Sequence, residues 1–221
     1  MEENLSVDEQ IISFKGRISL KTYNPKKTHK WGYKMWVLSG VSGFSYNFEL
    51  FTGKENNPDA NDDFGAASNV VVRMCQIVPD NIHHKVYFNN YFCSLNLISY
   101  LHNRGIDNVA TVRSNRLLDC KVLNDKVFKK RGQGSYEEQQ VKIGNCTIRI
   151  VQWFDNKVVS LASNFAGSLP ENKVKRFFKS ENTKKDIACP NIVGIYNKHM
   201  GGVDLLDSIL GLYPIKLRSK K

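Results

Sequence analysis

The spacing of the apolar residues changes along the first half of the chain, and this change constrains the fold more than any other feature. Residues 34–38 form an apolar run, and residues 44–50 alternate between large apolar and polar side chains, as in a strand with one buried face. Gly40 and Gly43 lie between the two segments, which predicts a hairpin. From residue 69 to residue 78 the apolar positions instead recur at the spacing of a helix.

Strands and helices then continue to alternate. Short apolar segments at residues 85–88 and 108–112 predict strands, and the apolar residues of 95–101 recur at helical spacing before a basic last turn and Gly105. An earlier apolar cluster within residues 6–34 predicts one more strand, which ends in a polar loop. A hairpin followed by strand-helix units predicts an α/β fold, in which a mixed sheet carries helices on its faces.

The second half of the chain has a different pattern. Residues 115–136 are polar and basic without a period, which predicts a loop. Two alternating segments joined by a Gly-Asn turn predict a second hairpin, and residues 157–162 predict a further strand. A second basic loop at residues 173–185 leads to Pro190, a favourable first residue for a long closing helix with an apolar stripe.

The composition excludes several classes of protein. The 221 residues include 41% apolar and 24% charged side chains, as in a globular chain large enough to bury a core. No run approaches the ~18 uncharged apolar residues of a membrane span, and the N-terminus lacks the features of a signal peptide. We therefore expect no membrane partner, no secretion, and a nuclear or cytoplasmic location. The five cysteines include no C-x-x-C pair, which predicts buried or free thiols and no zinc site.

The charge is strongly positive, which favours polyanionic partners. The chain has 32 Lys and Arg against 21 Asp and Glu, a net charge of +11, and no acidic residue lies between Glu9 and Glu49. Two interpretations stand: a solvated basic face, or a surface that follows the phosphates of double-stranded DNA. The candidate DNA-binding residues are Lys15, Arg17, Lys21, Lys26, Lys27, Lys30, Lys34, Lys129, Lys130 and Arg131.

Four polar residues lie where predicted elements end or pack closely. Asp8 is on the first strand, and Asn89 follows the strand at residues 85–88. Asp204 and Asp207 lie about one turn apart on the closing helix, where two like charges repel each other unless a positive group lies between them. Carboxylates brought from distant segments to one sheet edge are typical of sites that hold two magnesium ions ~4 Å apart for phosphodiester chemistry. The alternative for each residue is an ordinary solvated position.

Gly201 and Gly202 precede this acidic pair, and each costs a helix about 1 kcal/mol relative to alanine. Two explanations are equally consistent with the sequence. One is the close approach of another backbone or of DNA, and the other is a kink or break in the helix.

Five blocks of the sequence carry a resemblance that extends over nearly the whole chain. They are Leu5-Ser-Val-Asp-Glu-Gln10 with Phe14-Lys-Gly-Arg17, His29-Lys-Trp-Gly-Tyr-Lys34, Val86-Tyr-Phe-Asn-Asn-Tyr-Phe92, Trp153-Phe-Asp-Asn-Lys-Val-Val159 and Tyr196-Asn-Lys-His-Met-Gly-Gly-Val-Asp-Leu-Leu-Asp207. In this order they resemble the piggyBac transposase family. The resemblance implies an RNase H-like core with a β-rich insertion, divided into residues 1–112 (first part of the core), 113–190 (insertion with basic loops) and 191–221 (closing core helix and basic tail).

The resemblance also implies a set of site residues. Asp8 matches the first metal-binding aspartate of the family, and Asp204 and Asp207 match the pair on the final helix, with Mg²⁺ as the metal. Where the family has Phe-Asp-Asn-Tyr-Phe, this chain has Asn89 in place of the second aspartate. An amide keeps an oxygen that can coordinate but brings no negative charge. We therefore expect DNA cutting to be lost or severely weakened.

The resemblance further implies that an N-terminal region, helical segments for DNA binding and dimerisation, and a Cys-rich zinc-binding tail lie outside this chain. Three functions follow as hypotheses. The first is a transposase-derived nuclear protein with a degenerate DDE-type core, which binds double-stranded DNA through its basic loops and does not cut it. The second is an active, Mg²⁺-dependent transposase or nuclease. The third is a protein-interaction module or a decayed gene product without a DNA role, and the oligomeric state is left open.

Overall fold

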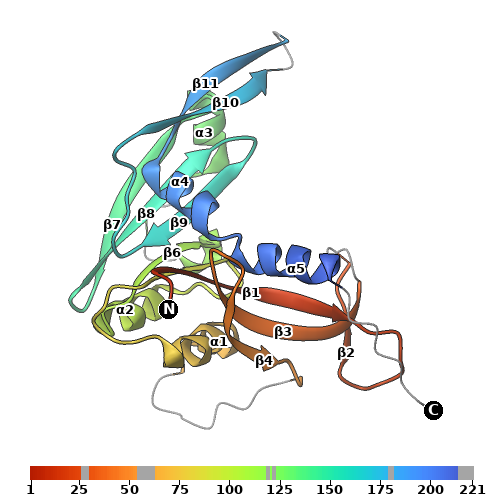
Figure 1. Cartoon of the computed structure of the whole chain (residues 1–221). Coiled ribbons are helices and arrows are strands. Elements are labelled where there is room, and N and C mark those ends of the chain that lie inside the picture. Colours follow the sequence, from red (N-terminus) through yellow and green to blue (C-terminus); the bar gives the residue numbers. More distant parts are fainter. Residues whose placement is uncertain (26–29, 54–62, 118–119, 121–122, 179–181, 214–221) are drawn as a thin grey trace.

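The computed structural model describes residues 1–25, 30–53, 63–117, 120, 123–178 and 182–213. These residues form a nine-stranded mixed sheet in the order β2-β3-β1-β5-β6-β9-β8-β7, with β4 paired to β3, and a separate two-stranded sheet of β10 and β11 (Figure 1). The strands of the main sheet are β1 (Asn4–Ser13), β2 (Lys21–Tyr23), β3 (Trp31–Gly40), β4 (Ser45–Leu50), β5 (Lys85–Phe88), β6 (Asp107–Thr111), β7 (Tyr136–Ile143), β8 (Cys146–Phe154) and β9 (Val158–Ser163). The smaller sheet consists of β10 (Asn172–Phe178) and β11 (Thr183–Cys189).

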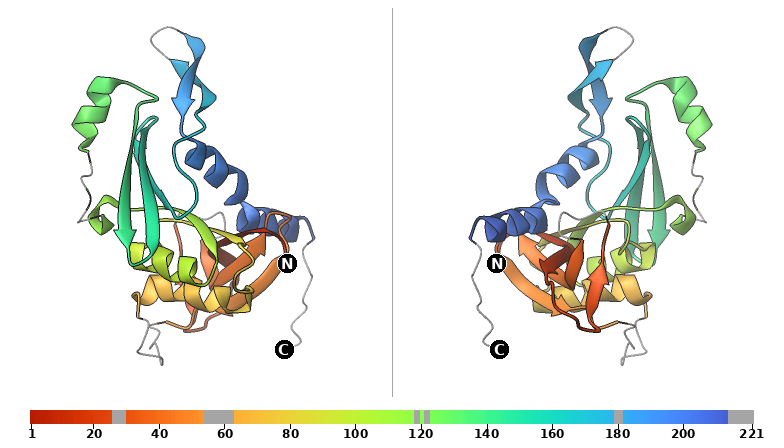
Figure 2. Two further views of the ribbon diagram at one scale, coloured as in Figure 1. Left: turned by 90° about the vertical axis from the view of Figure 1, so that its left-hand side faces the viewer. Right: turned by 90° about the vertical axis from the view of Figure 1, so that its right-hand side faces the viewer.

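Helices cover both faces of the main sheet. The helices are α1 (Ala66–Met74), α2 (Leu95–Asn103), α3 (Asp125–Arg131), α4 (Asn191–His199) and α5 (Gly202–Leu212). Figures 1 and 2 show α1 and α2 on one face, and α4 and α5 on the other. The predicted α/β fold, a mixed sheet flanked by helices, is confirmed.

The centre of the sheet brings distant segments side by side. β1 runs antiparallel to β3 and parallel to β5, and β5 runs parallel to β6. Val7 of β1 is in register with Phe88 of β5. The next residues along these two parallel strands are Asp8 and Asn89, so the register alone brings both to the same edge of the sheet.

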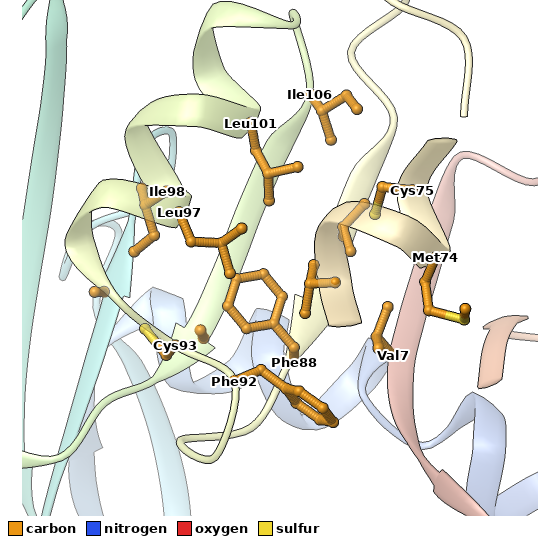
Figure 3. Packing of buried hydrophobic residues seen from close by; sticks show 14 of the residues in the cluster. Val7, Met74, Cys75, Phe88, Phe92, Cys93, Leu97, Ile98, Leu101 and Ile106 are labelled. Carbon is orange, nitrogen blue, oxygen red and sulfur yellow. The ribbon is translucent and has the colours of Figure 1, made fainter. Parts of the chain in front are cut away.

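The larger hydrophobic core lies between the sheet and helices α1 and α2. Phe88 and Phe92 are fully buried there against Leu97 and Leu101 of α2 and Met74 of α1 (Figure 3). Full burial of each such side chain contributes roughly 1.5–3 kcal/mol to folding. This packing fixes the chain on both sides of Asn89, because Phe88 precedes it and Phe92 follows it.

Most predicted elements of the first half are confirmed, although the polar loop predicted after the first strand contains β2 and the start of β3. The hairpin is β3 and β4, the strand at residues 85–88 is β5, and the strand near 108–112 is β6. The predicted helix over residues 69–78 is α1, which begins three residues earlier and continues into a 3₁₀ turn at Cys75–Ile77.

Two segments predicted as loops contain regular structure instead. Within residues 115–136 lies α3, which is short but capped, since the Asn124 side chain accepts a hydrogen bond from the backbone N–H of Lys126, and anchored by the buried ring of Phe128. Residues 173–185 belong largely to the β10–β11 hairpin. The abundance of lysine hid the strand alternation in this second segment.

The predicted long closing helix is two helices. α4 ends at His199 and α5 begins at Gly202, and Pro190 is the N-cap of α4 rather than its first residue. A Cβ atom at Gly202 would lie 2.4 Å from the carbonyl oxygen of Gly40 and 2.7 Å from Oγ of Ser6. The helix breaks at the two glycines, and the close approach of another strand applies to Gly202, because a Cβ atom at Gly201 would have no neighbour within 4 Å.

Strands β7, β8 and β9 extend the main sheet through the pairing of β9 with β6. Beyond them the β10–β11 hairpin, called the ribbon below, stands out from the body of the molecule (Figure 1). The boundaries of the insertion at residues 113 and 190 stay a prediction.

Candidate functional site

Asp8 and Asn89 are in direct contact. The side-chain nitrogen of Asn89 donates a hydrogen bond of 2.9 Å to Oδ1 of Asp8, and both residues are half-buried. The same Oδ1 atom accepts a second hydrogen bond of 2.8 Å from the backbone N–H of Glu9. The carboxylate of Asp8 is thus stabilised by two neutral donors from the protein itself.

A backbone group fixes the direction of the Asn89 amide. Its Oδ1 atom accepts a hydrogen bond of 2.8 Å from the backbone N–H of Tyr91. A backbone N–H can only donate, so the atom that faces it is the oxygen, and the atom that faces Asp8 is the nitrogen. The amide oxygen, expected from the sequence as a metal-coordinating atom, is therefore turned away from Asp8 and bonded to the backbone.

The other two predicted site residues lie on α5. Asp204 is exposed in the first turn of this helix, and Asp207 is half-buried about one turn later. The close approach of Gly202 to Ser6 and Gly40 places the N-terminus of α5 against β1 and β3. β1 is also the strand that carries Asp8.

Tyr196 is a half-buried polar residue on α4, near these acids. Burial raises its pKa to about 12, a hydrogen bond with the Thr111 side chain acts in the opposite direction, and the negative charges of Asp8 and Asp204 raise it further. The phenol therefore keeps its proton at neutral pH and lies within electrostatic range of both aspartates. From the sequence, Tyr196 belongs to the apolar stripe of the closing helix, so the pattern alone gave no reason to expect a polar role.

The donor groups do not match a site for two metal ions. A magnesium site requires several oxygen ligands, and at the Asp8–Asn89 pair one of the facing atoms is an amide nitrogen. In the described part of the chain, no group of three or more His, Cys, Asp or Glu side chains is placed to hold a metal ion. The joint role of Asp8, Asp204 and Asp207 as metal ligands stays a prediction.

The predicted DNA-binding residues occupy different environments. Lys15, Arg17 and Lys30 are exposed, whereas Lys21 and Lys34 are half-buried. The ammonium of Lys34 lies 4.0 Å from the ring centroid of Trp36, 5.2 Å from that of Tyr91 and 5.7 Å from that of Phe51. Lys34 is therefore engaged in cation–π contacts inside the fold. Lys26 and Lys27 lie outside the described residues.

The remaining predicted residues lie on α3. Lys129, Lys130 and Arg131 are exposed in its last turn, where positive charge is favourable at the C-terminal end of a helix. Arg131 also forms an ion pair of 2.8 Å with Glu137.

The thiols of Cys75, Cys93, Cys146 and Cys189 are buried and form no disulfide. Burial raises the pKa of Cys75 and of Cys93 to about 12, so neither is a reactive thiolate at neutral pH. No helix within the described ranges has the length and apolar character needed to cross a membrane.

Known proteins resemble this chain along its full length. The family profile described as Transposase IS4 matches residues 1–221. Human PiggyBac transposable element-derived protein 3 is 30% identical over 224 residues, which cover 100% of this chain and 37% of that protein. Human PiggyBac transposable element-derived protein 2 is 27% identical over 228 residues, which again cover 100% of this chain and 37% of the relative.

A solved structure has the same fold. It is a cryo-EM structure of a piggyBac transposase synaptic complex with hairpin DNA, which matches with a TM-score of 0.69 and 23% identity over 95% of this chain and 40% of the solved chain. The chain thus spans less than half the length of the proteins it matches. With the fold shared and the family profile matched from end to end, this chain belongs to the IS4 transposase family, in its piggyBac branch, and has the RNase H-like core expected from its sequence.

Proposed function

We propose that this chain is a transposase-derived protein that binds duplex DNA and does not cut it. The observation that carries the proposal is the hydrogen bond from the Asn89 amide to Asp8. An aspartate in place of Asn89 would set two carboxylates against each other, and a cation between them would relieve the repulsion. The amide removes that need, because it donates a hydrogen bond to Asp8 directly.

DNA binding is supported by charge. The net charge is +11, and exposed basic residues are found at Lys15, Arg17 and Lys30 and in the last turn of α3. Contacts of this kind are made to phosphates, so we expect binding with little sequence preference that weakens steeply as salt increases. A chromosomal DNA partner would place the protein in the nucleus.

The variant Asn89→Asp tests the loss of cutting. We expect no nicking of supercoiled plasmid by the unmodified chain in Mg²⁺ or Mn²⁺, nicking by Asn89→Asp, and none by the double variant Asn89→Asp with Asp8→Ala. Asn90→Asp is the matched control, because it adds the same charge to the neighbouring, exposed position. Metal-dependent nicking by the unmodified chain that Asp8→Ala abolishes would instead establish an active nuclease.

Thermal unfolding gives a readout that does not depend on cutting. Without divalent metal, Asn89→Asp should unfold at a lower temperature than the unmodified chain, because a second carboxylate then replaces the amide donor beside Asp8. Mg²⁺ should restore much of this loss in Asn89→Asp and change little in the unmodified chain or in Asn90→Asp. Equal responses of all three proteins to Mg²⁺ would show that Asn89 does not control the charge balance at Asp8.

Fluorescence anisotropy with a labelled DNA duplex tests the binding. The logarithm of the association constant should fall linearly with the logarithm of the salt concentration. Joint replacement of Lys15, Arg17 and Lys30 by alanine should weaken binding and make this slope shallower. A chain that binds no duplex at 50 mM salt would contradict the proposed function.

A further inference from the structure

The ribbon, formed by β10 and β11, is the most prominent projection of the molecule. Figures 1 and 2 show it standing clear of the main sheet, beyond the start of α4. In the described part of the chain its two strands pair with each other and with no strand of the main sheet. β11 continues through Pro190 into α4, so the ribbon is joined directly to the helix that carries Tyr196.

The root of the ribbon is held firmly by the body of the protein. On its inner face Ile187 is buried in the second hydrophobic cluster together with Trp153 of β8. The indole N–H of Trp153 donates a hydrogen bond of 2.9 Å to the carbonyl oxygen of Ala188. Arg176 places its Nε atom 2.9 Å and 3.0 Å from the two carboxylate oxygens of Asp155. These contacts orient the ribbon as a fixed arm.

The outer face of the ribbon is basic. Strand alternation puts Lys173, Lys175 and Phe177 on one face of β10, and the register with β11 adds Lys184 opposite Phe177 and Asp186 opposite Lys175. All five residues are exposed, and the ring of Phe177 is 53% exposed. Three positive charges and one negative charge thus surround a solvent-facing aromatic ring.

This combination suits the groove of a DNA duplex. The major groove is about 12 Å wide and admits a two-stranded β-ribbon. Alternate side chains on a strand are ~7 Å apart. Along the helix axis, this distance spans about two phosphates of one DNA strand, which follow each other every ~3.4 Å. Lys173 and Lys175 can therefore contact phosphates in sequence, while an apolar ring such as Phe177 contacts base edges and thymine methyl groups.

We propose that the outer face of the ribbon docks in the major groove of duplex DNA, with Lys173, Lys175 and Lys184 on phosphates and Phe177 against the bases. The proposal rests on the proposed DNA binding and adds a contact surface separate from the basic residues at positions 15–34 and on α3. It assigns residues 173–185, predicted from the sequence as one of the basic loops that bind DNA, a defined position in the groove.

A matched pair of double variants tests the lysines. Lys173→Ala with Lys175→Ala should reduce duplex affinity on the order of tenfold or more at 0.1 M salt and make the salt slope shallower by about 1.8. The control, Lys142→Ala with Lys198→Ala, removes the same charge from exposed positions away from the ribbon and should have a much smaller effect. Because the replaced side chains are exposed, both variants should unfold at the temperature of the parent chain.

Phe177→Ala separates base contact from charge. It should weaken DNA binding severalfold and leave the salt slope unchanged, because no phosphate contact is removed. Duplex RNA of the same sequence is the second probe, since the major groove of A-form RNA is too deep and narrow for the ribbon. The lysine variant should therefore lose more affinity for DNA than for RNA.

The outcomes separate this proposal from the one on which it rests. If the parent chain binds no duplex at 50 mM salt, both proposals are overturned. If the parent binds DNA but the ribbon pair behaves like its control pair, the ribbon has no role and the DNA-binding function stands. Equal losses on DNA and RNA would exclude docking in the major groove.

Discussion

Two basic segments of this chain carry similar charge and place it differently. In the first basic segment, residues 15–34, Lys21 lies 5.2 Å from the ring centroid of Trp31 and Lys34 lies 4.0 Å from that of Trp36. In the ribbon, the lysines of the outer face are exposed, and it is the inner face that packs against the protein. Two lysines of the first segment are stacked on aromatic rings, whereas the outer face of the ribbon presents Lys173, Lys175 and Lys184 to solvent.

The difference teaches that positive charge in a sequence does not measure the charge available to a partner. A lysine stacked on aromatic rings stabilises the fold, and only part of its charge remains for phosphates. A lysine on the outer face of a projecting hairpin makes no comparable contribution to the core. The first three predictions below each compare a residue of the ribbon, or one that packs at its root, with a residue of the first basic segment.

The largest effect is expected at the root of the ribbon. Trp153 is only 3% exposed, so Trp153→Ala should lower the free energy of unfolding by about 3–5 kcal/mol, through the cavity and the lost hydrogen bond to Ala188. Trp31→Ala in the first basic segment is the control, since this indole is 53% exposed and its loss should cost less than about 1 kcal/mol. Urea unfolding measures both, and equal losses would show that the ribbon is not anchored at Trp153.

The second prediction compares the loss of a lysine stacked on aromatic rings with the loss of a solvent-exposed lysine. Lys34→Ala should lower the free energy of unfolding by about 1–2 kcal/mol, because its ammonium contacts three rings. Lys173→Ala should change stability by less than about 0.5 kcal/mol. DNA affinity should respond in the opposite order, falling more for Lys173→Ala. A greater loss of affinity in Lys34→Ala would invert the comparison.

The third prediction concerns an ion pair that orients the ribbon. Arg176→Gln removes the contact of its Nε atom with Asp155 and should lower the free energy of unfolding by about 0.5–1 kcal/mol, since both groups are partly exposed. Arg17→Gln, at an exposed position of the first segment, should change stability less. The loss in Arg176→Gln should shrink at 1 M salt, where ion pairs are screened.

Much of the fold could be predicted because its signals are local. The strand at residues 85–88 is a short apolar run bounded by turns, and its limits were predicted to the residue. The ribbon was not predicted because its inner face contains an arginine among apolar residues. Half-buried and exposed positions alternate along β10, but apolar and polar residues do not. The break between α4 and α5 depends on Gly40, a partner 162 residues away that periodicity within one helix cannot reveal.

The contact between Asp8 and Asn89 agrees with the sequence, but its chemistry could not be predicted. Parallel pairing of β1 and β5 places Asp8 beside Asn89, in agreement with the family resemblance. The direction of the Asn89 amide is set by the backbone N–H of Tyr91, and no property of the residue type specifies it. A polar role for Tyr196 could not be predicted, because the residue fits the apolar stripe of the closing helix. Its charged neighbours, Asp8 and Asp204, come from other elements of the fold.

The smallest effect is a dependence on pH that should separate the body of the protein from the ribbon. Burial lowers the pKa of His199, and the positive charge of Lys198 lowers it further. Below the unfolded value of about 6.5 the unfolded chain binds a proton at His199 more readily than the folded chain, so stability should fall as the pH decreases below 6.5 and be unaffected by His199 above it. His199→Phe, which keeps a ring against Tyr87, should reduce this dependence in urea unfolding between pH 7.5 and pH 5.5. Residues 172–189 contain no histidine. The ratio of DNA affinities between the parent and the double variant Lys173→Ala with Lys175→Ala should therefore stay constant with pH while stability changes. A ratio that changes with pH in the parent but not in His199→Phe would show that the two parts of the molecule are coupled.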